Sequence, residues 1–144
     1  MGRFDFEIPQ DFINQLGKLA DMDRVAPQML NTAAPILVRN LKAALAKHRQ
    51  TGDLEKSVRR TGAKKNRYGH FVTVRPTGTS SNYISSDGTK KKMEVHVANM
   101  QKFMHLELGT SNQPARPVLA KVLKDSEAEC LRIMQEVFDR EMTK

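Results

Sequence analysis

The chain has 144 residues, of which 39% are hydrophobic and 28% charged, and its formal net charge is +8. This length suits one folded domain with one core, and the composition excludes a disordered chain. No apolar run of 18 residues occurs and the first residues lack the pattern of a signal peptide, so we expect a chain of the cytosol with no membrane partner.

Two helical segments are predicted before residue 50. The first follows Pro9, where Phe12, Leu16 and Leu19 have helical spacing. The second is longer, with Asp23 as its predicted N-cap, and Pro35 should bend it because proline cannot donate to the carbonyl four residues earlier. Its apolar face repeats every three or four residues and runs to about residue 50: Met29, Ala33, Leu37, Leu41, Ala44, Leu45 and His48.

The middle of the chain predicts strands. Gly52 favours a helix stop, and residues 54–58 favour a turn or two of helix before the first strand. Residues 70–75 and 93–98 alternate between apolar and polar side chains, and we expect them to pair as an antiparallel hairpin. Residues 76–92 are rich in Ser, Thr, Gly and Lys, so we expect a mobile loop that becomes ordered on assembly.

The C-terminal part predicts a connector, residues 100–117, and a helix, residues 117–142. Pro117 suits the first position of that helix, because its missing N–H would have no partner there. The apolar face of the helix is wide, which indicates packing inside the molecule, the commoner case, or a surface shared with another subunit. It contains Leu119, Val122, Ser126, Cys130, Ile133 and Val137, widened by Leu123, Leu131, Met134 and Phe138.

These elements predict an α+β fold in which a long N-terminal helical region and a C-terminal helix pack on a small antiparallel β-sheet. We expect a single domain, residues 1–144. Within it, residues 9–50 form the helical region, 54–99 a basic region with the β-hairpin and the mobile loop, 100–117 the connector, and 117–142 the final helix.

The positive charge is concentrated in one part of the chain. Residues 47–92 contain 12 Lys or Arg and 3 Asp or Glu, a net charge of +9, whereas the rest of the chain has a net charge of −1. Such a local excess can face phosphate, an acidic protein surface or solvent. The candidate contacts for DNA or for a protein partner are Arg59, Arg60, Lys64, Lys65, Arg67, Lys90, Lys91 and Lys92, with Tyr68, Phe71 and Tyr83 as possible stacking groups.

No pattern typical of a catalytic or metal site is present. His48, His70, His96 and His105 are scattered without the spacing of zinc ligands, and Cys130 is the single cysteine. Neither a Gly-x-Ser-x-Gly elbow nor a phosphate-binding glycine loop occurs. We therefore predict that the chain is not an enzyme and uses no cofactor or metal, and that Cys130 is a small buried helix residue.

The connector contains a stiff polar segment. Pro114 and Pro117 each fix one φ angle and restrain the residue before them, so the segment loses little entropy when it is ordered. Glu107 is the most obvious partner of Arg116, and we expect an ion pair that acts as a local latch. The alternative is that Arg116 or residues 110–113 contact a neighbouring subunit.

Two motifs occur in a fixed order in the chain. The upstream motif, TGDLEKSV, follows the long helix and contains Thr51, Gly52, Leu54, Ser57 and Val58. The downstream motif is an aromatic residue and Glu, then Gly-Thr and Pro-Ala-Arg-Pro before a final helix: Phe103, Glu107, Gly109, Thr110, Pro114, Ala115, Arg116 and Pro117. Together they resemble a family of small neck proteins of long-tailed bacteriophages of the HK-type siphophage kind, called head-tail joining, tail-completion or minor tail proteins, in which the upstream element reads Thr-Gly-x-Leu-x-x-Ser-Ile.

The resemblance implies a structural role in virion assembly: a subunit of a tailed phage or prophage that joins the tail to the filled head as a ring oligomer around the DNA passage. The implied partners are other copies of the chain, the tail terminator or tail-tube protein, and head-completion or connector proteins. The implied location is the neck or tail of the virion, after assembly in the host bacterial cytoplasm. A basic module that binds DNA without sequence specificity is the alternative function, and a small enzyme has the weakest claim.

Overall fold

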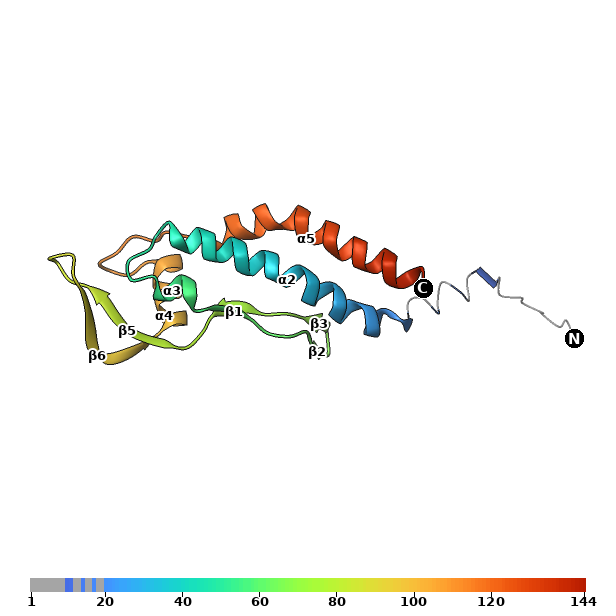
Figure 1. Ribbon diagram of the computed structural model, residues 1–144, viewed down its shortest axis with the longest axis horizontal. Coiled ribbons are helices and arrows are strands. Elements are labelled where there is room, and N and C mark those ends of the chain that lie inside the picture. The colour runs from blue at the N-terminus through green and yellow to red at the C-terminus, as the bar shows by residue number, and fades with distance from the viewer. Residues whose placement is uncertain (1–9, 12–13, 15–16, 18–19) are drawn as a thin grey trace, which may run out of the picture.

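The computed structural model describes residues 10, 11, 14, 17 and 20–144. Figure 1 shows an elongated molecule in which helices α2 (Met22–Ala46) and α5 (Leu119–Met142) lie side by side above short strands. The fold is α+β, with long N-terminal and C-terminal helices and small antiparallel sheets, which confirms the predicted class. The first predicted helix, centred on Phe12, Leu16 and Leu19, lies outside the described residues.

Helix α2 is the predicted long helix, with different ends. It begins at Met22 and ends at Ala46, four residues short of the predicted end. Asp23 is not the N-cap but lies in the first turn, so its carboxylate is free to bind side chains from another element. The buried face confirms the helical repeat and contains Val25, Ala33, Ala34, Ile36, Leu41 and Leu45.

Helix α5 runs antiparallel to α2 and packs along it (Figure 1). It begins at Leu119, two residues after Pro117, so the prediction of Pro117 as its first residue is wrong. The face towards α2 confirms part of the predicted stripe, including Cys130, which is buried against Ala33 and Ile36. The small side chains at this contact allow the two helices to approach closely, and Asn40 Nδ2 donates to Ser126 Oγ at 2.7 Å across it.

The strands pair differently from the prediction. Residues 70–75 contain two short strands, β3 (Gly69–Phe71) and β4 (Val74–Pro76), and they pair with β2 (Lys64–Asn66) and β1 (Val58–Arg60). The four strands form one interrupted ribbon, in which Thr61 N donates to Thr73 O at 2.9 Å between the two ladders. The predicted pairing of residues 70–75 with 93–98 is therefore wrong, because nearer residues in the chain supply the partner strand.

Residues 76–92 do not form a long loop, which corrects a second prediction. Strand β5 (Thr79–Ile84) pairs with β6 (Lys90–Ala98) in an antiparallel ribbon that extends from the body (Figure 1). The turn between them is closed by a bond of 2.9 Å from Ser85 N to Thr89 O. Two exposed strands can pair through their main chains without alternating apolar side chains. The polar sequence of β5 therefore gives no strand pattern.

The main core lies at the end of the molecule where the short elements meet. Helix α3 (Asp53–Lys56) and helix α4 (Asn99–Leu108) pack there against the C-terminal half of α2 and the start of α5. The buried cluster joins α2, β1, α4, α5 and Val118, the residue before α5, through Leu41, Leu45, Val58, Phe103, Leu106, Val118 and Val122. Both sequence motifs contribute to this cluster.

Candidate assembly surfaces

The upstream motif forms a structural corner. Gly52 has a φ of +82°, which favours glycine, and places Thr51 before the short helix α3. Leu54 packs against the main core, and Val58 is fully buried in it. The Ser57 hydroxyl donates to Leu54 O at 2.6 Å, while Ser57 O accepts the Thr77 N–H at 2.9 Å. The motif therefore fixes the passage from α2 into strand β1.

Asp53, inside this motif, joins the corner to the β5–β6 ribbon. Its Oδ2 accepts hydrogen bonds from Thr51 Oγ1 at 3.0 Å and from Asn82 Nδ2 at 2.8 Å. Burial opposes ionisation of Asp53, but these hydrogen bonds, with the positive charges of Lys90 and Lys102, outweigh it and lower the pKa of the carboxyl. Asn82 is a contact that the sequence did not indicate, because a single Asn in a polar stretch has no pattern.

A second polar contact attaches the base of the same ribbon to α4. Asn99 is buried, and its Oδ1 accepts from Ser80 Oγ at 2.9 Å while its Nδ2 donates to Thr77 O at 2.8 Å. Lys102 Nζ also donates to Ser80 Oγ, at 2.5 Å. The β5–β6 ribbon is thus anchored at its base by buried hydrogen bonds.

Helix α4 takes up residues 100–108 of the predicted connector, and the rest of the connector, residues 109–117, is folded back on itself and bonded to α4. Thr110 N donates to Gln113 O at 2.8 Å, and Arg116 N donates to Leu106 O at 2.7 Å. Gly109 has φ +76° and ψ 176°, a region open almost only to glycine. A Cβ at Gly109 would lie 2.7 Å from Ala115 N, so the turn has no room for a side chain. The stiffness predicted from Pro114 and Pro117 is therefore reinforced by main-chain bonds.

Glu107 does not form the predicted ion pair with Arg116. Its Oε2 instead accepts the main-chain N–H groups of Val118, at 2.9 Å, and Leu119, at 3.4 Å. These are the first N–H groups of α5, which have no partner within the helix, so Glu107 caps α5 from a different helix. Glu107 therefore does act as a local latch, but it binds the N-terminus of α5 and not Arg116, because the N–H groups of Val118 and Leu119 lie within hydrogen-bond distance of its carboxylate.

The two motifs meet around one cleft of about 260 Å³. Thr51, Gly52 and Leu54 line it from one side, and Gln113 and Arg116 line it from the other. Its wall also contains the buried Glu55, which pairs with Arg49 through Oε1 while its Oε2 has no hydrogen-bond partner among the described residues. The remaining lining residues come from α2, the turn after it, α4 and the β5–β6 ribbon: Leu45, His48, Gln50, Asn82, Tyr83, Met93, Lys102, His105 and Leu106.

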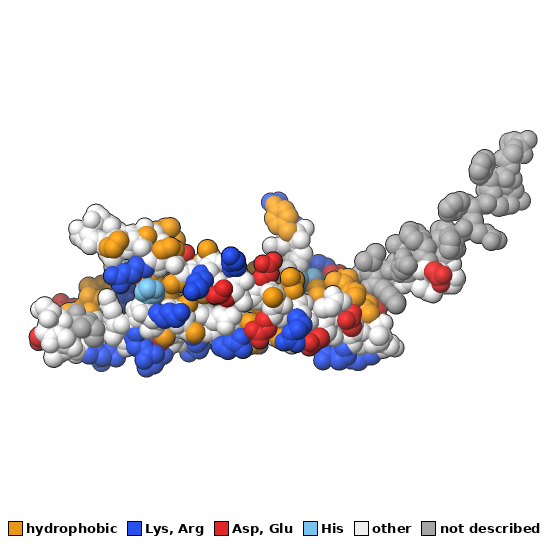
Figure 2. All heavy atoms as spheres, turned by 90° about the horizontal axis from the view of Figure 1, so that it is seen from above, with side chains coloured by type: hydrophobic (Ala, Val, Ile, Leu, Met, Phe, Trp, Pro, Cys, Tyr) orange, Lys and Arg blue, Asp and Glu red, His pale blue; other side chains and the backbone are white. Residues whose placement is uncertain are grey.

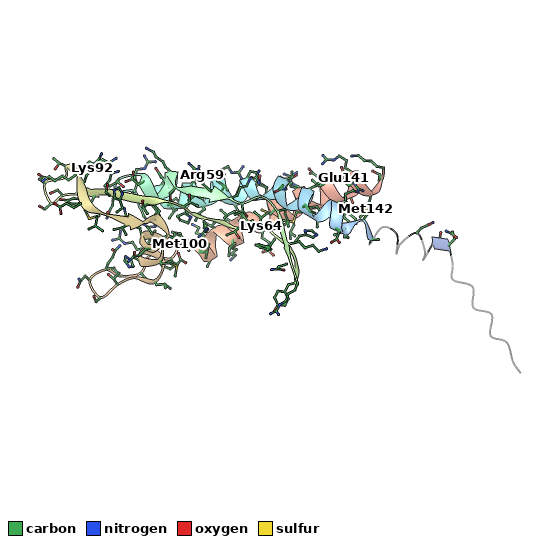
Figure 3. All side chains as sticks on the ribbon, turned by 90° about the horizontal axis from the view of Figure 1, so that it is seen from below. Arg59, Lys64, Lys92, Met100, Glu141 and Met142 are labelled. Carbon is green, nitrogen blue, oxygen red and sulfur yellow. The ribbon has the colours of Figure 1, made fainter. Side chains whose placement is uncertain are left out.

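The basic residues that are adjacent in the sequence do not form one surface. Figure 3 shows Arg59 and Lys92 along one long edge of the molecule, whereas the β2–β3 ribbon, which begins at Lys64, points away from that edge. Figure 2 shows Lys and Arg side chains in a row along the lower edge. Lys90 and Lys91 lie on the exposed β6 strand, where Lys91 pairs with Asp87 at 3.7 Å. The candidate contacts therefore divide into three groups: Lys90, Lys91 and Lys92 on β6, and two further groups on other elements.

One group surrounds an open groove of about 660 Å³ between α2 and β1, which we call the basic groove. Arg39, Lys42, Arg59 and Arg60 line it together with the apolar Pro35, Val38 and Val58. Arg39 pairs with Glu129 of α5 at 2.8 Å. The Arg59 guanidinium donates to the main-chain oxygen of Val58 at 2.9 Å, which holds it at the groove.

The other group forms the β2–β3 finger, residues 64–71. At its base, Asp23 of α2 accepts from Lys65 Nζ at 2.7 Å and lies 3.0 Å from His70 Nε2. The hydrogen bond from Lys65, followed by that from His70, holds the pKa of Asp23 below its usual range. At the tip, the Tyr68 side chain is 81% exposed and the Arg67 guanidinium lies 4.6 Å from the centre of its ring.

Among the described residues, no group of three or more His, Cys, Asp or Glu side chains could hold a metal ion. Burial raises the pKa of the Cys130 thiol, with a smaller contribution from Glu129, so the thiol stays protonated. Within the part of the chain that the structure describes, no helix is long and apolar enough to cross a membrane. Comparison of the chain with family models, curated proteins and solved structures finds no match.

Proposed function

We propose that the chain is a structural assembly subunit of a tailed phage or prophage, which joins the tail to the head in the neck of the particle. It would work by contact with other copies of itself, with the tail terminator or tail-tube protein, and with head-completion or connector proteins. No step of this role requires catalysis or a cofactor. Its location would be the virion, after assembly in the host bacterial cytoplasm.

One observation supports the proposal most directly: the two motifs that resemble the neck family lie against each other. They are about fifty residues apart in the sequence, yet Gly52 and Arg116 line the same cleft. Each motif also holds its own element in place, the first through Ser57 and Thr77 and the second through Glu107 and α5. Two motifs that form one local structure favour a common structural role over two chance similarities.

The test begins with host cells that produce the remaining head and tail proteins of the same phage or prophage genome. We expect cells that lack this chain to accumulate filled heads and separate tails, visible by electron microscopy, and the wild-type chain to restore joined particles. Light scattering of the purified chain, alone and mixed with the tail terminator or head-completion protein, should show a larger complex. A chain that stays monomeric with every one of these proteins and is dispensable for joining would contradict the proposal.

The motif cleft can be tested in the same assay. Gln113→Ala and Arg116→Ala change side chains that line the cleft and retain the main-chain bonds of the connector. We expect them to weaken complex formation without unfolding the chain. Arg75→Ala, at an exposed position on β4, is the matched control and should leave complex formation unchanged.

Non-specific DNA binding is the second candidate function, and the β2–β3 finger is the observation that favours it. A two-stranded ribbon fits the major groove of DNA, and the tip carries a cation and an exposed aromatic ring, Arg67 and Tyr68. We expect the logarithm of the DNA affinity to fall linearly with that of the salt concentration, with the slope reduced by about 0.9 for each phosphate contact removed. Arg67→Ala should reduce this slope, and Lys91→Ala, on the other ribbon, should leave it unchanged. Equal changes in the slope for the two variants would contradict a role of the finger in DNA binding.

A further inference from the structure

The outward side of α5 carries leucine side chains that nothing in the described chain covers. Leu119, Leu123 and Leu131 are 39%, 51% and 58% exposed. They are spaced by four or eight residues, and Glu127 fills the remaining position of the same row. We call these four residues the outer stripe. Several large apolar side chains aligned on one exposed face indicate a contact surface, whereas single exposed leucines need no explanation.

The basic groove is the second uncovered surface, and its chemistry is complementary. Its accessible apolar part, the exposed Pro35 and the half-buried Val38, fits leucine side chains, while Val58 lies buried beneath them in the core. The four cations around the groove would attract a carboxylate. Lys42 pairs with no acidic side chain among the described residues, and Glu127 of the outer stripe likewise has no ion-pair partner there. The groove therefore offers a cation for Glu127, and the outer stripe offers a carboxylate for Lys42.

The two surfaces lie on opposite flanks of the molecule. In α5, Ser126 and Cys130 face α2, and each residue turns the helix by about 100°. Glu129 points to the flank of the basic groove, where it binds Arg39. Glu127, two residues earlier, points about 160° away from Glu129 around the helix axis. The outer stripe therefore cannot reach the groove of its own chain.

We propose that the outer stripe of one copy packs into the basic groove of the next copy, with Glu127 against Lys42. Because the two surfaces differ and lie on opposite flanks, this contact is head-to-tail and propagates around a ring or along a filament. The inference rests on the proposed function and names the contact between its subunits. Symmetric pairing of two outer stripes would bring the Glu127 carboxylates together and leave Lys42 without an acidic partner among the described residues.

Disulfide trapping between two different variants tests the contact. Pro35→Cys places a thiol at an exposed position in the groove, Leu123→Cys places one on the outer stripe, and the native Cys130 stays buried and unreactive. In a mixture of the two variants we expect at least about tenfold more crosslinked dimer than in either variant alone, a difference of about 1.4 kcal/mol in association free energy. A mixture of Pro35→Cys with Tyr68→Cys, at the exposed finger tip, is the matched control.

Charge exchange tests the pairing of Glu127 with Lys42. We expect Lys42→Glu in the groove variant, or Glu127→Lys in the stripe variant, to lower the crosslink yield about fivefold. Combining the two reversed charges in one mixture should restore the yield. Thermal unfolding of each variant shows that the chain remains folded.

Three results would overturn the inference: a mixed yield no higher than the control, an equally strong crosslink in Leu123→Cys alone, or duplex DNA that binds the groove in a Lys42-dependent way and abolishes the crosslink. If trapping fails while the chain still joins heads to tails, the contact is wrong and the proposed function stands. If the disulfide crosslink forms but heads and tails join without the chain, the contact between copies is supported and the proposed neck function is wrong.

Discussion

The connector and the β2–β3 finger are both exposed and polar, yet they are held in different ways. Connector residues 111–117 are exposed, but the main chain of the segment is bonded to Leu106 and across its own turn, and Gly109 leaves no space at its entry. The finger strands are bonded mainly to each other, and Asp23 holds their base. Side-chain exposure therefore does not measure restraint, and the main-chain partners of a segment do.

The largest effect is expected at the entry of the connector. Gly109→Ala combines a backbone region open almost only to glycine with a Cβ at 2.7 Å from Ala115 N, so we expect a loss of about 3 kcal/mol in the free energy of unfolding. Chemical denaturation measures it. Gly62→Ala, where a Cβ meets nothing within 4 Å, should change stability by less than about 0.5 kcal/mol. Equal effects would mean that the connector is not restrained.

A smaller loss is expected from the cap of α5. Glu107→Ala removes the acceptor of the Val118 and Leu119 N–H groups and should cost about 1 kcal/mol, measured by urea unfolding. Glu136→Ala, which removes an exposed pair within α5, is the control and should cost only a few tenths, about 0.3 kcal/mol. Arg116→Ala should behave like the control; a larger loss than for Glu107→Ala would restore the ion-pair latch.

The stability of the fold should depend on pH through Glu141. Hydrogen bonding from Lys144, opposed by burial and supported by Arg24, lowers the pKa of Glu141 from its ordinary value of 4.5. A lowered pKa in the folded state stabilises the fold above the ordinary pKa, and this contribution disappears as the pH falls through the folded-state value. We expect Glu141→Gln to lower the urea midpoint near neutral pH and to converge with wild type in acid. A difference independent of pH would contradict the assignment.

The smallest global effect is expected at the base of the finger. Asp23→Asn removes the charge that binds Lys65 and His70, so the finger should open more often while the body keeps its stability. Hydrogen exchange of main-chain amides in residues 64–71 should accelerate about threefold or more, with little change for α2 and α5. Asp87→Asn, in the turn of the other ribbon, should leave the finger unchanged. Acceleration throughout the chain would show that the finger and the body unfold together.

The sequence predicts the parts of this fold that depend on long local repeats. The apolar spacing from Ala33 to Leu45 and from Val122 to Val137 is enough to define α2 and α5. The strand pairing could not be predicted, because short polar strands such as β5 carry no alternation and their register depends on turns and anchoring contacts. The sequence therefore predicts one wrong pairing, of residues 70–75 with 93–98, where the structure has the ribbon of β1 to β4 and the β5–β6 ribbon.

For the candidate surfaces, the sequence names residues but not how their side chains are used. The predicted ion pair between Glu107 and Arg116 is wrong, because the nearness of the α5 N–H groups to Glu107 depends on the tertiary structure. The local excess of basic residues is visible in the sequence, but their division between the groove, the finger and strand β6 depends on how the ribbons fold back, for example at residues 67–68. The contacts of Asn82 with Asp53 have no sequence signal.

Contacts near both ends of the α2–α5 pair hold the helices in register. The hydrogen bond between Asn40 and Ser126, near the C-terminal end of α2, and the 3.0 Å ion pair between Arg24 and Glu141, at the other end, oppose sliding of the helices past each other by a turn. At 1.5 Å per residue, the paired helices form a strut of about 36 Å. Two objects attached to its opposite ends would be kept at a constant spacing.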